Sequence, residues 1–282
     1  CLSGAVPHHY TGTFFGSVTV DGNDTCEVSL TDVSQIVGSV LQDIDTQMVA
    51  SVVEDEMLFG LENFGVPHDQ IEQRVSETLE TVGISDLRDR EIATLSGGQK
   101  QKVAIAAILA MRPRVLVLDE PTAALDPASS TLVFETLREA NRALGITIVV
   151  VEQKVALLSE YCNRVLVLNH GEIALQGEPH EVFAHADELR AIGVDCPRVT
   201  RIFNSLEADG LASGTPCLDV DEAERLIMGI VDPAHASSDI QAPAGSPHAP
   251  SLRPRAKDAE PVLAFDHVEF AYPNGGGAVH DL

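Results

Sequence analysis

The chain has few cationic residues. Lys and Arg together number 18 against 43 Asp and Glu, which gives a formal net charge of −25 over 282 residues. A field of that sign repels phosphate backbones and acidic polymers in general. The composition therefore predicts no nucleic-acid partner.

Long apolar runs and paired cysteines are also missing. The longest apolar run, from Val103 to Met111, stops at Arg112 and is far shorter than the roughly 20 residues that a membrane-spanning helix requires. The five cysteines are scattered and form no C-x-x-C pair, which argues against a zinc knuckle or a disulfide framework. Apolar residues still make up 44% of the chain, enough for a sizeable core in one or two domains.

Short apolar runs alternate with segments of helical period up to about residue 170. The pattern predicts a hairpin around 169–171, strands over 14–20, 36–41, 115–118 and 146–151, and helices over 53–63, 70–82, 97–111 and 128–144. Strands alternating with helices in this way favour an α/β domain with a parallel sheet. The run 146–151 is continuously apolar and β-branched, so we expect it to be buried on both faces.

The composition changes in the C-terminal part of the chain. Residues 181–231 are more polar with a helical pattern, 232–260 hold five prolines among Ala, Ser and Gly, and a strand pattern returns after 261. We therefore expect a first domain over 1–180, a helical extension over 181–231, a linker over 232–260 and the start of a second domain over 261–282. Because the chain opens on Cys1 without a Met, we expect it to be a piece of a longer protein.

A double glycine lies at the start of the predicted helix 97–111. Ser96 and Gln99 have the S-x-x-Q spacing of a capping box, which is a common local feature. Gly97 and Gly98 go beyond a capping box, because two residues without side chains let another backbone approach the free N–H groups of the helix N-terminus. Such a terminus favours an anionic phosphate.

Two carboxylates end the apolar strand 115–118. One of Asp119 and Glu120 suits Mg²⁺ held together with phosphate oxygens, and the other can orient or deprotonate a water. A strand that ends in Asp-Glu is, however, often only a solvated strand end. Asp126 and Pro127 follow closely and predict the N-cap and the first residue of the next helix.

Taken together, the motifs LSGGQ, VLVLDEP and ALDP resemble the ATPase subunit of ABC transporters in their order and spacing. The resemblance implies a P-loop NTPase-like α/β domain with a helical subdomain, in which two ATPase domains face head to tail and share two ATP molecules. It implies that Asp119 serves Mg²⁺, that Glu120 is the catalytic base and that Asp126 lies in the loop crossing the dimer interface. The ATP of the partner domain would be contacted by the signature residues Ser96, Gly97, Gly98 and Gln99.

The region around Gln42 resembles one particular class within this family. Gln42 follows the strand 36–41 and matches the family's glutamine loop, which touches Mg²⁺ or the lytic water and moves with the membrane subunit. The surrounding stretch VGSVLQDIDTQMVASVVEDEMLFGLENFGVP, together with the segments 5–22 and 178–209, is similar to the energy-coupling-factor class, whose members import vitamins and transition metals such as cobalt. The resemblance covers roughly 1–230 and resumes at 262, where Tyr272 matches an aromatic residue that stacks on adenine.

Two departures from the family pattern concern the triphosphate. The phosphate-binding motif G-x-x-x-x-G-K-[ST] is absent from the sequence, and we expect it just upstream of Cys1. The strand 146–151 should lead to a switch histidine, but Gln153 holds that place. Glutamine can hydrogen-bond a γ-phosphate but cannot carry the charge of an imidazolium. The resemblance therefore implies weakened hydrolysis at this site.

The sequence thus predicts an ATP-binding and ATP-hydrolysing subunit, working with Mg²⁺, that energises an energy-coupling-factor-type importer from the cytoplasmic face of the cell membrane. Its partners would be integral membrane transport subunits, a substrate-binding membrane protein and a second ABC domain in the same chain. A soluble tandem ABC protein acting on ribosomes or DNA, and a non-hydrolysing regulatory ABC ATPase, are the alternatives. The negative charge argues against the first of these. So does the helix after Gln42, where Val52, Val53, Met57 and Phe59 are expected to offer apolar surface to a membrane partner.

Overall fold

The structure is a computed structural model that describes residues 2–9, 16–230, 270–271 and 278–279. The chain divides into two units, Cys1–Val231 and Asp232–Leu282. In the second unit, β8 (Phe270–Ala271) pairs antiparallel with β9 (Ala278–Val279). Tyr272 and the expected linker 232–260 lie outside the described residues.

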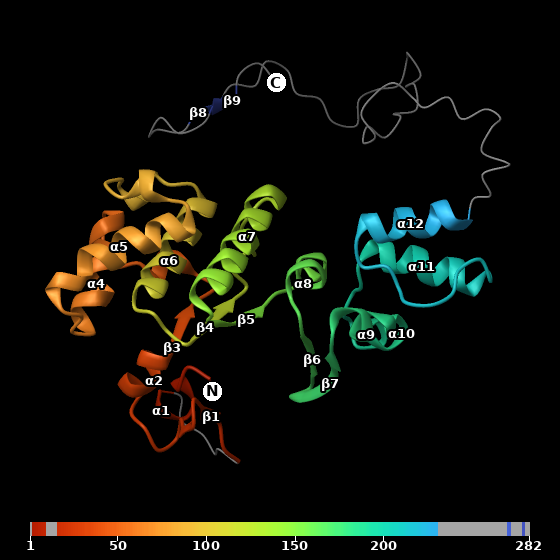
Figure 1. The fold of residues 1–282 in the computed structure, drawn as a ribbon, viewed down its shortest axis with the longest axis horizontal. Coiled ribbons are helices and arrows are strands. Elements are labelled where there is room, and N and C mark those ends of the chain that lie inside the picture. Colours follow the sequence, from red (N-terminus) through yellow and green to blue (C-terminus); the bar gives the residue numbers. More distant parts are fainter. Residues whose placement is uncertain (1, 10–15, 231–269, 272–277, 280–282) are drawn as a thin grey trace. The chain divides into compact units, whose positions relative to one another are not determined.

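A three-stranded parallel sheet lies in the middle of the first unit (Figure 1). Its strand order is β3 (Val37–Val40), β4 (Val115–Asp119) and β5 (Thr147–Val151). The strands expected over 36–41, 115–118 and 146–151 are confirmed, and so is their parallel pairing. Because the three strands run the same way, the chain leaves all of them at one edge of the sheet.

The expectation that β5 is buried on both faces is wrong. Its end residues are exposed, its middle residues are half-buried, and the side chain of Val151 is 55% exposed. Among the described residues β5 pairs only with β4 and forms an edge of the sheet, so its side chains have a neighbouring strand on one side only.

Helices α4 (Val53–Asn63), α5 (His68–Val82) and α6 (Gly97–Ala110) pack on one another, and α5 and α6 also contact α7 (Pro127–Leu144) (Figure 1). All four helices were expected from the sequence to within two residues at each end. On α5, apolar side chains at helical spacing are buried in the core that these helices share, namely Ile71, Val75, Leu79 and Val82. The helix ends at Gly83, whose φ of 69° is favourable for glycine.

The buried face of α7 is one turn shorter than its sequence predicts. Val133, Leu137 and Ala140 are buried as expected, but Leu144 is 42% exposed. Leu144 is the last residue of the helix, and Gly145, with a φ of 65°, turns the chain away immediately after it. The final turn therefore has little core to contact.

The segment before the sheet contains short elements. These are α1 (Ala5–His8), β1 (Thr19–Val20), β2 (Asn23–Asp24) and α2 (Leu30–Ile36). Only Thr19–Val20 of the strand expected over 14–20 is strand, and residues 14 and 15 lie outside the described part. The sequence reading missed α2, which begins with a capping box between Ser29 and Asp32.

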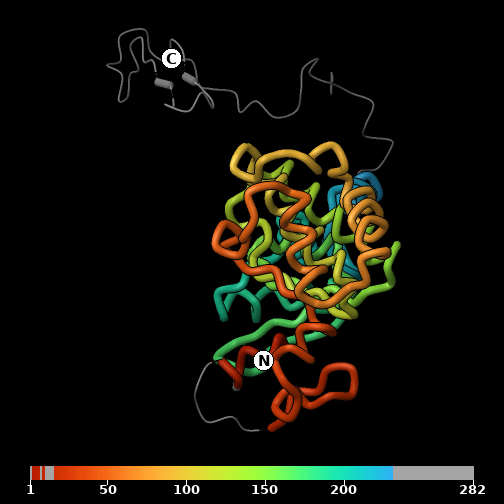
Figure 2. The backbone as a smooth tube through the Cα atoms, turned by 90° about the vertical axis from the view of Figure 1, so that its left-hand side faces the viewer, coloured from red at the N-terminus to blue at the C-terminus, as the bar shows by residue number. Residues whose placement is uncertain are grey.

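Beyond the sheet, α8 (Val155–Tyr161) leads to the expected hairpin, made of β6 (Val165–Asn169) and β7 (Glu172–Gly177). The hairpin and the N-terminal elements lie toward the same end of the unit (Figure 2). A separate core joins the hairpin to the helices that follow, through Val167, Phe183 and Leu189. These helices are α9 (Pro179–Ala184) and α10 (Ala186–Ala191). Next come α11 (Arg198–Ala208) and α12 (Val220–Ile230), which share a core of their own through Phe203 and Ala223. None of the described helices is long and apolar enough to span a membrane.

Candidate active site

Three of the expected site residues meet at the carboxyl edge of the parallel sheet. Gln42 follows β3, Glu120 follows β4 and Gln153 follows β5. The Nε2 of Gln42 donates to Oε2 of Glu120 at 2.9 Å, and the Nε2 of Gln153 donates to Oε1 at 2.5 Å. Each oxygen of the carboxylate therefore accepts a hydrogen bond from a neutral amide, and the side chain is held from two neighbouring strands.

The backbone of Glu120 also has an unusual conformation. Its φ is 44°, in the left-handed region that a residue with a side chain seldom adopts. Its N–H donates to the carbonyl of Val151 at 2.8 Å, and its carbonyl accepts from the N–H of Ala123 at 3.1 Å. Such a conformation costs on the order of 1–3 kcal/mol and is found most often at functional sites, where surrounding contacts hold it in place.

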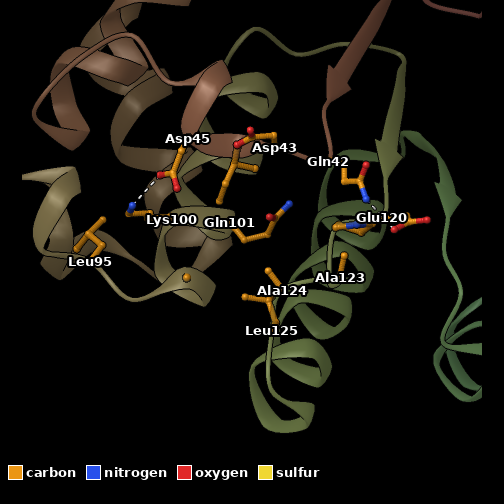
Figure 3. Close-up of a pocket in the computed structure, with 13 residues that line it drawn as sticks. Gln42, Asp43, Asp45, Leu95, Lys100, Gln101, Glu120, Ala123, Ala124 and Leu125 are labelled. Carbon is orange, nitrogen blue, oxygen red and sulfur yellow. Dashed lines mark hydrogen bonds and ion pairs between the residues drawn. The ribbon is translucent and has the colours of Figure 1, made fainter. Parts of the chain in front are cut away.

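A cleft of about 210 Å³ opens beside Glu120 (Figure 3). One wall is the loop after β4, including Glu120 and Leu125, and the other is the start of α6, including Gly97 and Lys100. The loop after β3 closes a third side. In Figure 3 the amide of Gln42 points toward Glu120, across the cleft from α6.

The signature residues form the expected helix start. The hydroxyl of Ser96 accepts from the N–H of Gln99 at 3.3 Å, and Oε1 of Gln99 accepts from the N–H of Ser96 at 3.0 Å, so the capping box of α6 is confirmed. A Cβ on Gly97 would lie 3.2 Å from Cδ2 of Leu125, and one on Gly98 would lie 3.2 Å from Cβ of Ser129. The two glycines therefore also let α6 approach the start of α7 within this chain.

Asp126 caps α7, and Pro127 is the first residue of that helix, as expected. The Oδ1 of Asp126 accepts from the N–H groups of Ala128 and Ser129, both at 3.0 Å, and the Oδ2 of Asp126 accepts from the hydroxyl of Ser129 at 2.5 Å. The hydroxyl of Ser129 is the main cause that lowers the pKa of Asp126 below its usual value. Asp126 is therefore an ionised cap on an exposed loop.

Two side-chain contacts hold the loop that carries Gln42. Oε1 of Gln47 accepts from the N–H of Leu41 at 2.8 Å, which closes the loop on itself. The ammonium of Lys100, on the first turns of α6, forms an ion pair with Asp45 at 2.7 Å (Figure 3). The glutamine loop and the signature helix are thus joined directly.

Comparison with known proteins agrees with this arrangement. The family profile described as "ABC transporter" matches residues 9–123. The energy-coupling factor transporter ATP-binding protein EcfA1 of Clostridium perfringens is 40% identical over 208 residues, which cover 73% of this chain and 74% of the relative. The chain belongs to the ATP-binding proteins of ABC transporters. It is similar to members of the energy-coupling factor type, and EcfA1 of Symbiobacterium thermophilum is 45% identical over 210 residues, 73% of this chain and 72% of that protein.

A solved structure supports the assignment to the ABC ATPase fold. The structure of cbiO1 from Clostridium perfringens, described as part of the ABC transporter complex cbiONQ, matches with a TM-score of 0.54 at 38% identity. The match covers 63% of this chain and 70% of that one. The fold is therefore the P-loop NTPase-like α/β fold that the sequence predicts.

The donor set of this ABC ATPase fits the magnesium nucleotide expected for the family. Asp119 is exposed at the end of β4 and directly precedes Glu120, whose carboxylate accepts from the amide of Gln42. Across the described residues no three His, Cys, Asp or Glu side chains gather closely enough to hold a metal by themselves. Mg²⁺ usually takes only one or two protein carboxylates and completes its shell with phosphate oxygens and water. A site of this kind suits Mg²⁺ with ATP better than it suits a metal held by protein alone.

Only part of the apolar surface expected on α4 is exposed. Val53 and Met57 are 0% exposed because they face the core between α4, α5 and α6. Phe59 is 52% exposed, as expected, and the loop before the helix adds Val49, which is 61% exposed. The exposed apolar surface is thus carried by the outer side of α4 and the glutamine loop.

The sequence reading missed Lys154, which follows Gln153 directly. The ammonium of Lys154 bonds to the loop between Glu120 and Asp126, and Glu152 bonds to the buried hydroxyl of Thr122. A lysine next to the switch position was the one available signal, and by itself it does not reveal a contact with a segment 24–32 residues away.

Proposed function

We propose that the chain is the ATP-hydrolysing subunit of an energy-coupling-factor-type importer of vitamins or transition-metal ions. The observation that carries the proposal is the carboxylate of Glu120, held between Gln42 and Gln153 at the edge of the parallel sheet and facing a cleft whose far wall is the signature helix. The two relatives named above, both energy-coupling factor transporter ATP-binding proteins, support the class of transporter.

The residues of the cleft have distinct roles in this proposal. Glu120 accepts a proton from the attacking water, and the amides of Gln42 and Gln153 hold its carboxylate in the required orientation. Asp119 would serve the Mg²⁺ that neutralises charge on the phosphates when the nucleotide is bound. On the other wall, the first turn of α6 offers backbone N–H groups to the γ-phosphate of an ATP held by a partner domain, through Ser96, Gly97, Gly98 and Gln99.

The remaining assignments follow the same head-to-tail arrangement. Asp126 would lie in the loop that crosses the dimer interface, and Tyr272 would stack on the adenine of a second ABC domain in the same chain. The partners would be integral membrane transport subunits and a substrate-binding membrane protein, with the chain peripheral at the cytoplasmic face of the cell membrane. The exposed apolar side chains of Val49 and Phe59 support such contacts, and the net charge of −25 speaks against nucleic acid.

A signature-residue variant tests the function. Ser96→Arg places a bulky side chain where the γ-phosphate of the partner's ATP would lie, so we expect ATP turnover by the assembled transporter complex to fall at least tenfold. Ser205→Arg, on α11 and remote from the cleft, is the matched control. Co-sedimentation of the chain with ribosomes instead of membranes, or unchanged turnover in Ser96→Arg, would contradict the proposal.

The 282-residue chain by itself lacks the phosphate-loop lysine that grips the triphosphate in this family. We therefore expect it to bind Mg-ATP weakly or not at all and not to turn it over. Isothermal titration calorimetry with Mg-ATP measures this directly, and micromolar binding by the isolated chain would show that another group replaces the lysine.

A further inference from the structure

The turn that follows β5 is tied to the loop that follows β4. Oε1 of Glu152 accepts from the N–H groups of Gln153 and Lys154, at 2.9 and 3.2 Å, and so fixes the turn. Its Oε2 accepts from the hydroxyl of Thr122 at 2.7 Å, and Thr122 is fully buried. The carboxylate of Glu152 therefore joins the switch position to the loop beyond Glu120.

The ammonium of Lys154 makes a second and stronger connection. It donates to the carbonyl of Thr122 at 2.7 Å, to the carbonyl of Leu125 at 3.2 Å and to the hydroxyl of Ser130 at 2.8 Å. A lysine ammonium has three N–H donors, so all three are used. In the described part of the chain Lys154 forms no ion pair with a carboxylate, and its charge is directed at the oxygens of this loop.

Two of the three acceptors are the first and last carbonyls of the loop 122–125, and the third, the hydroxyl of Ser130, lies on α7. Glu120 lies just before this loop, and Asp126, the cap of α7, lies just after it. Within the loop, the N–H of Leu125 donates to the carbonyl of Thr122 at 3.1 Å, so the backbone forms a tight turn around the ammonium. Lys154 thus fixes the distance between the switch position and both ends of the loop.

We propose that Lys154 is a positioning residue of the ATP site, which holds the loop 122–125 against the Gln153 turn so that Glu120, Asp126 and Gln153 move as one unit. The proposal rests on the function proposed above. It does not make Lys154 essential for folding, because α7 keeps its own cap and its buried face of Val133 and Leu137.

Hydrogen exchange of the full chain tests the contact without nucleotide. In Lys154→Met the amides of Ala123 and Leu125, both hydrogen-bonded inside the loop, should exchange at least tenfold faster, and Lys154→Arg should restore most of the protection. The matched control is Lys102→Met, since Lys102 donates only to the carbonyl of Val82 at 3.3 Å, away from the loop. Unchanged exchange in Lys154→Met would overturn the proposal.

ATP turnover by the assembled complex tests the positioning role. In the assembled complex of the intact protein, with the other composite site blocked by Ser96→Arg, Lys154→Met should lower the remaining kcat about tenfold while KM for ATP stays within twofold, and Lys154→Arg should recover most of that kcat. If Lys154→Met fails to fold, Ser130→Ala removes one acceptor and should shift exchange and kcat in the same direction by a smaller factor. Equal losses in Lys102→Met, or an unchanged kcat in Lys154→Met, would overturn the proposal. A complex of the intact, unsubstituted protein without turnover would refute the proposed function, while the exchange data would still decide the contact.

Discussion

Gln153 gives Glu120 a neutral hydrogen-bond donor where the family pattern has an imidazole. Losing one charge-assisted contact to the transition state costs on the order of 2–4 kcal/mol of barrier, or about 10²–10³ in rate. Since the amide still donates one hydrogen bond, the loss at this residue should be partial. We therefore expect two unequal sites in the dimer, with the slower one built on Glu120 and Gln153.

This asymmetry can be measured with two substitutions. Glu120→Gln should lower total ATP turnover of the assembled complex only slightly, because the other composite site does most of the work. Gln153→His should raise turnover, because it restores a group that can carry charge. Steady-state phosphate release measures both. Complete loss of turnover in Glu120→Gln would mean that Gln153 is a working replacement for histidine.

At the level of residues, the sequence predicts those site members that follow strands directly. Gln42, Glu120 and Gln153 were expected from their places in the family pattern, each shortly after a strand, and parallel pairing brings them together. The contacts of Lys154 could not be predicted in this way, since they depend on how the loop 122–125 turns back in space. The left-handed backbone of Glu120 has no sequence signal either, because a glutamate carries none of the usual preference for positive φ.

Among the helical elements, a charged cluster joins α4 and α5 to the turn after α5. The guanidinium of Arg88 donates to Glu72 through Nη1 at 2.8 Å and Nη2 at 2.7 Å, and it also pairs with Glu54. The hydrogen bond from Arg88 is the main cause that lowers the pKa of Glu72 from 4.5 to about 2. The folded protein therefore favours the ionised form of Glu72 more than the unfolded chain does.

The pH dependence of stability follows from this shift. A carboxyl group with a lowered folded-state pKa contributes stability that is fully present above its unfolded value and is lost as pH falls toward the folded value. The contribution of Glu72 should therefore disappear between about pH 4.5 and about pH 2. Thermal unfolding followed by circular dichroism should show a smaller acid-induced drop in Glu72→Gln than in wild type. Glu80→Gln on the same helix is the control, and an equal change in both would contradict the assignment.

The close packing of α6 on β3 gives a second prediction for the elements. A Cβ on Gly38 would lie only 2.2 Å from Cγ2 of Ile108, so Gly38→Ala forces that side chain to move. We expect a loss of about 1–3 kcal/mol in the free energy of unfolding, as is usual for an overpacked core.

A double substitution checks this cause. Adding Ile108→Ala should lower the free energy of unfolding less in the Gly38→Ala background than in wild type. Gly229→Ala, on α12 with open space around the added methyl group, should leave the stability unchanged or slightly higher. Strict additivity of the Gly38 and Ile108 changes would show that the two residues do not compete for space.

The sequence predicts the elements better than it predicts their burial. The helices α4 to α7 were predicted because their apolar residues recur at helical spacing, and the starts of α6 and α7 are also marked by capping residues. The exposure of β5 and the burial of Met57 were not predicted, because each depends on which neighbour covers a face. The short helix α2 was missed because its seven residues, about two turns, carry only one buried side chain, Val33.

The whole molecule carries a formal net charge of −25, which opposes the compact state through self-repulsion. Salt shortens the screening length from about 10 Å at 0.1 M to about 3 Å at 1 M. We therefore expect the midpoint of thermal unfolding to rise by a few degrees between 0.02 and 1 M KCl. A shift of that size corresponds to a gain of about 1 kcal/mol in the free energy of unfolding. NaCl should act equally if the effect is screening, and a falling midpoint in both salts would show that attractive ion pairs dominate.

The two amides on Glu120 have one further consequence, for the response of the site to acid. Neither Gln42 nor Gln153 gains or loses a proton in the physiological range, whereas a histidine at the switch position would change its charge near pH 6.5. The contacts on both oxygens of Glu120 thus keep the same donors when the pH falls through that range. A transporter built on this chain would retain one nucleotide site whose switch contact does not respond to proton concentration.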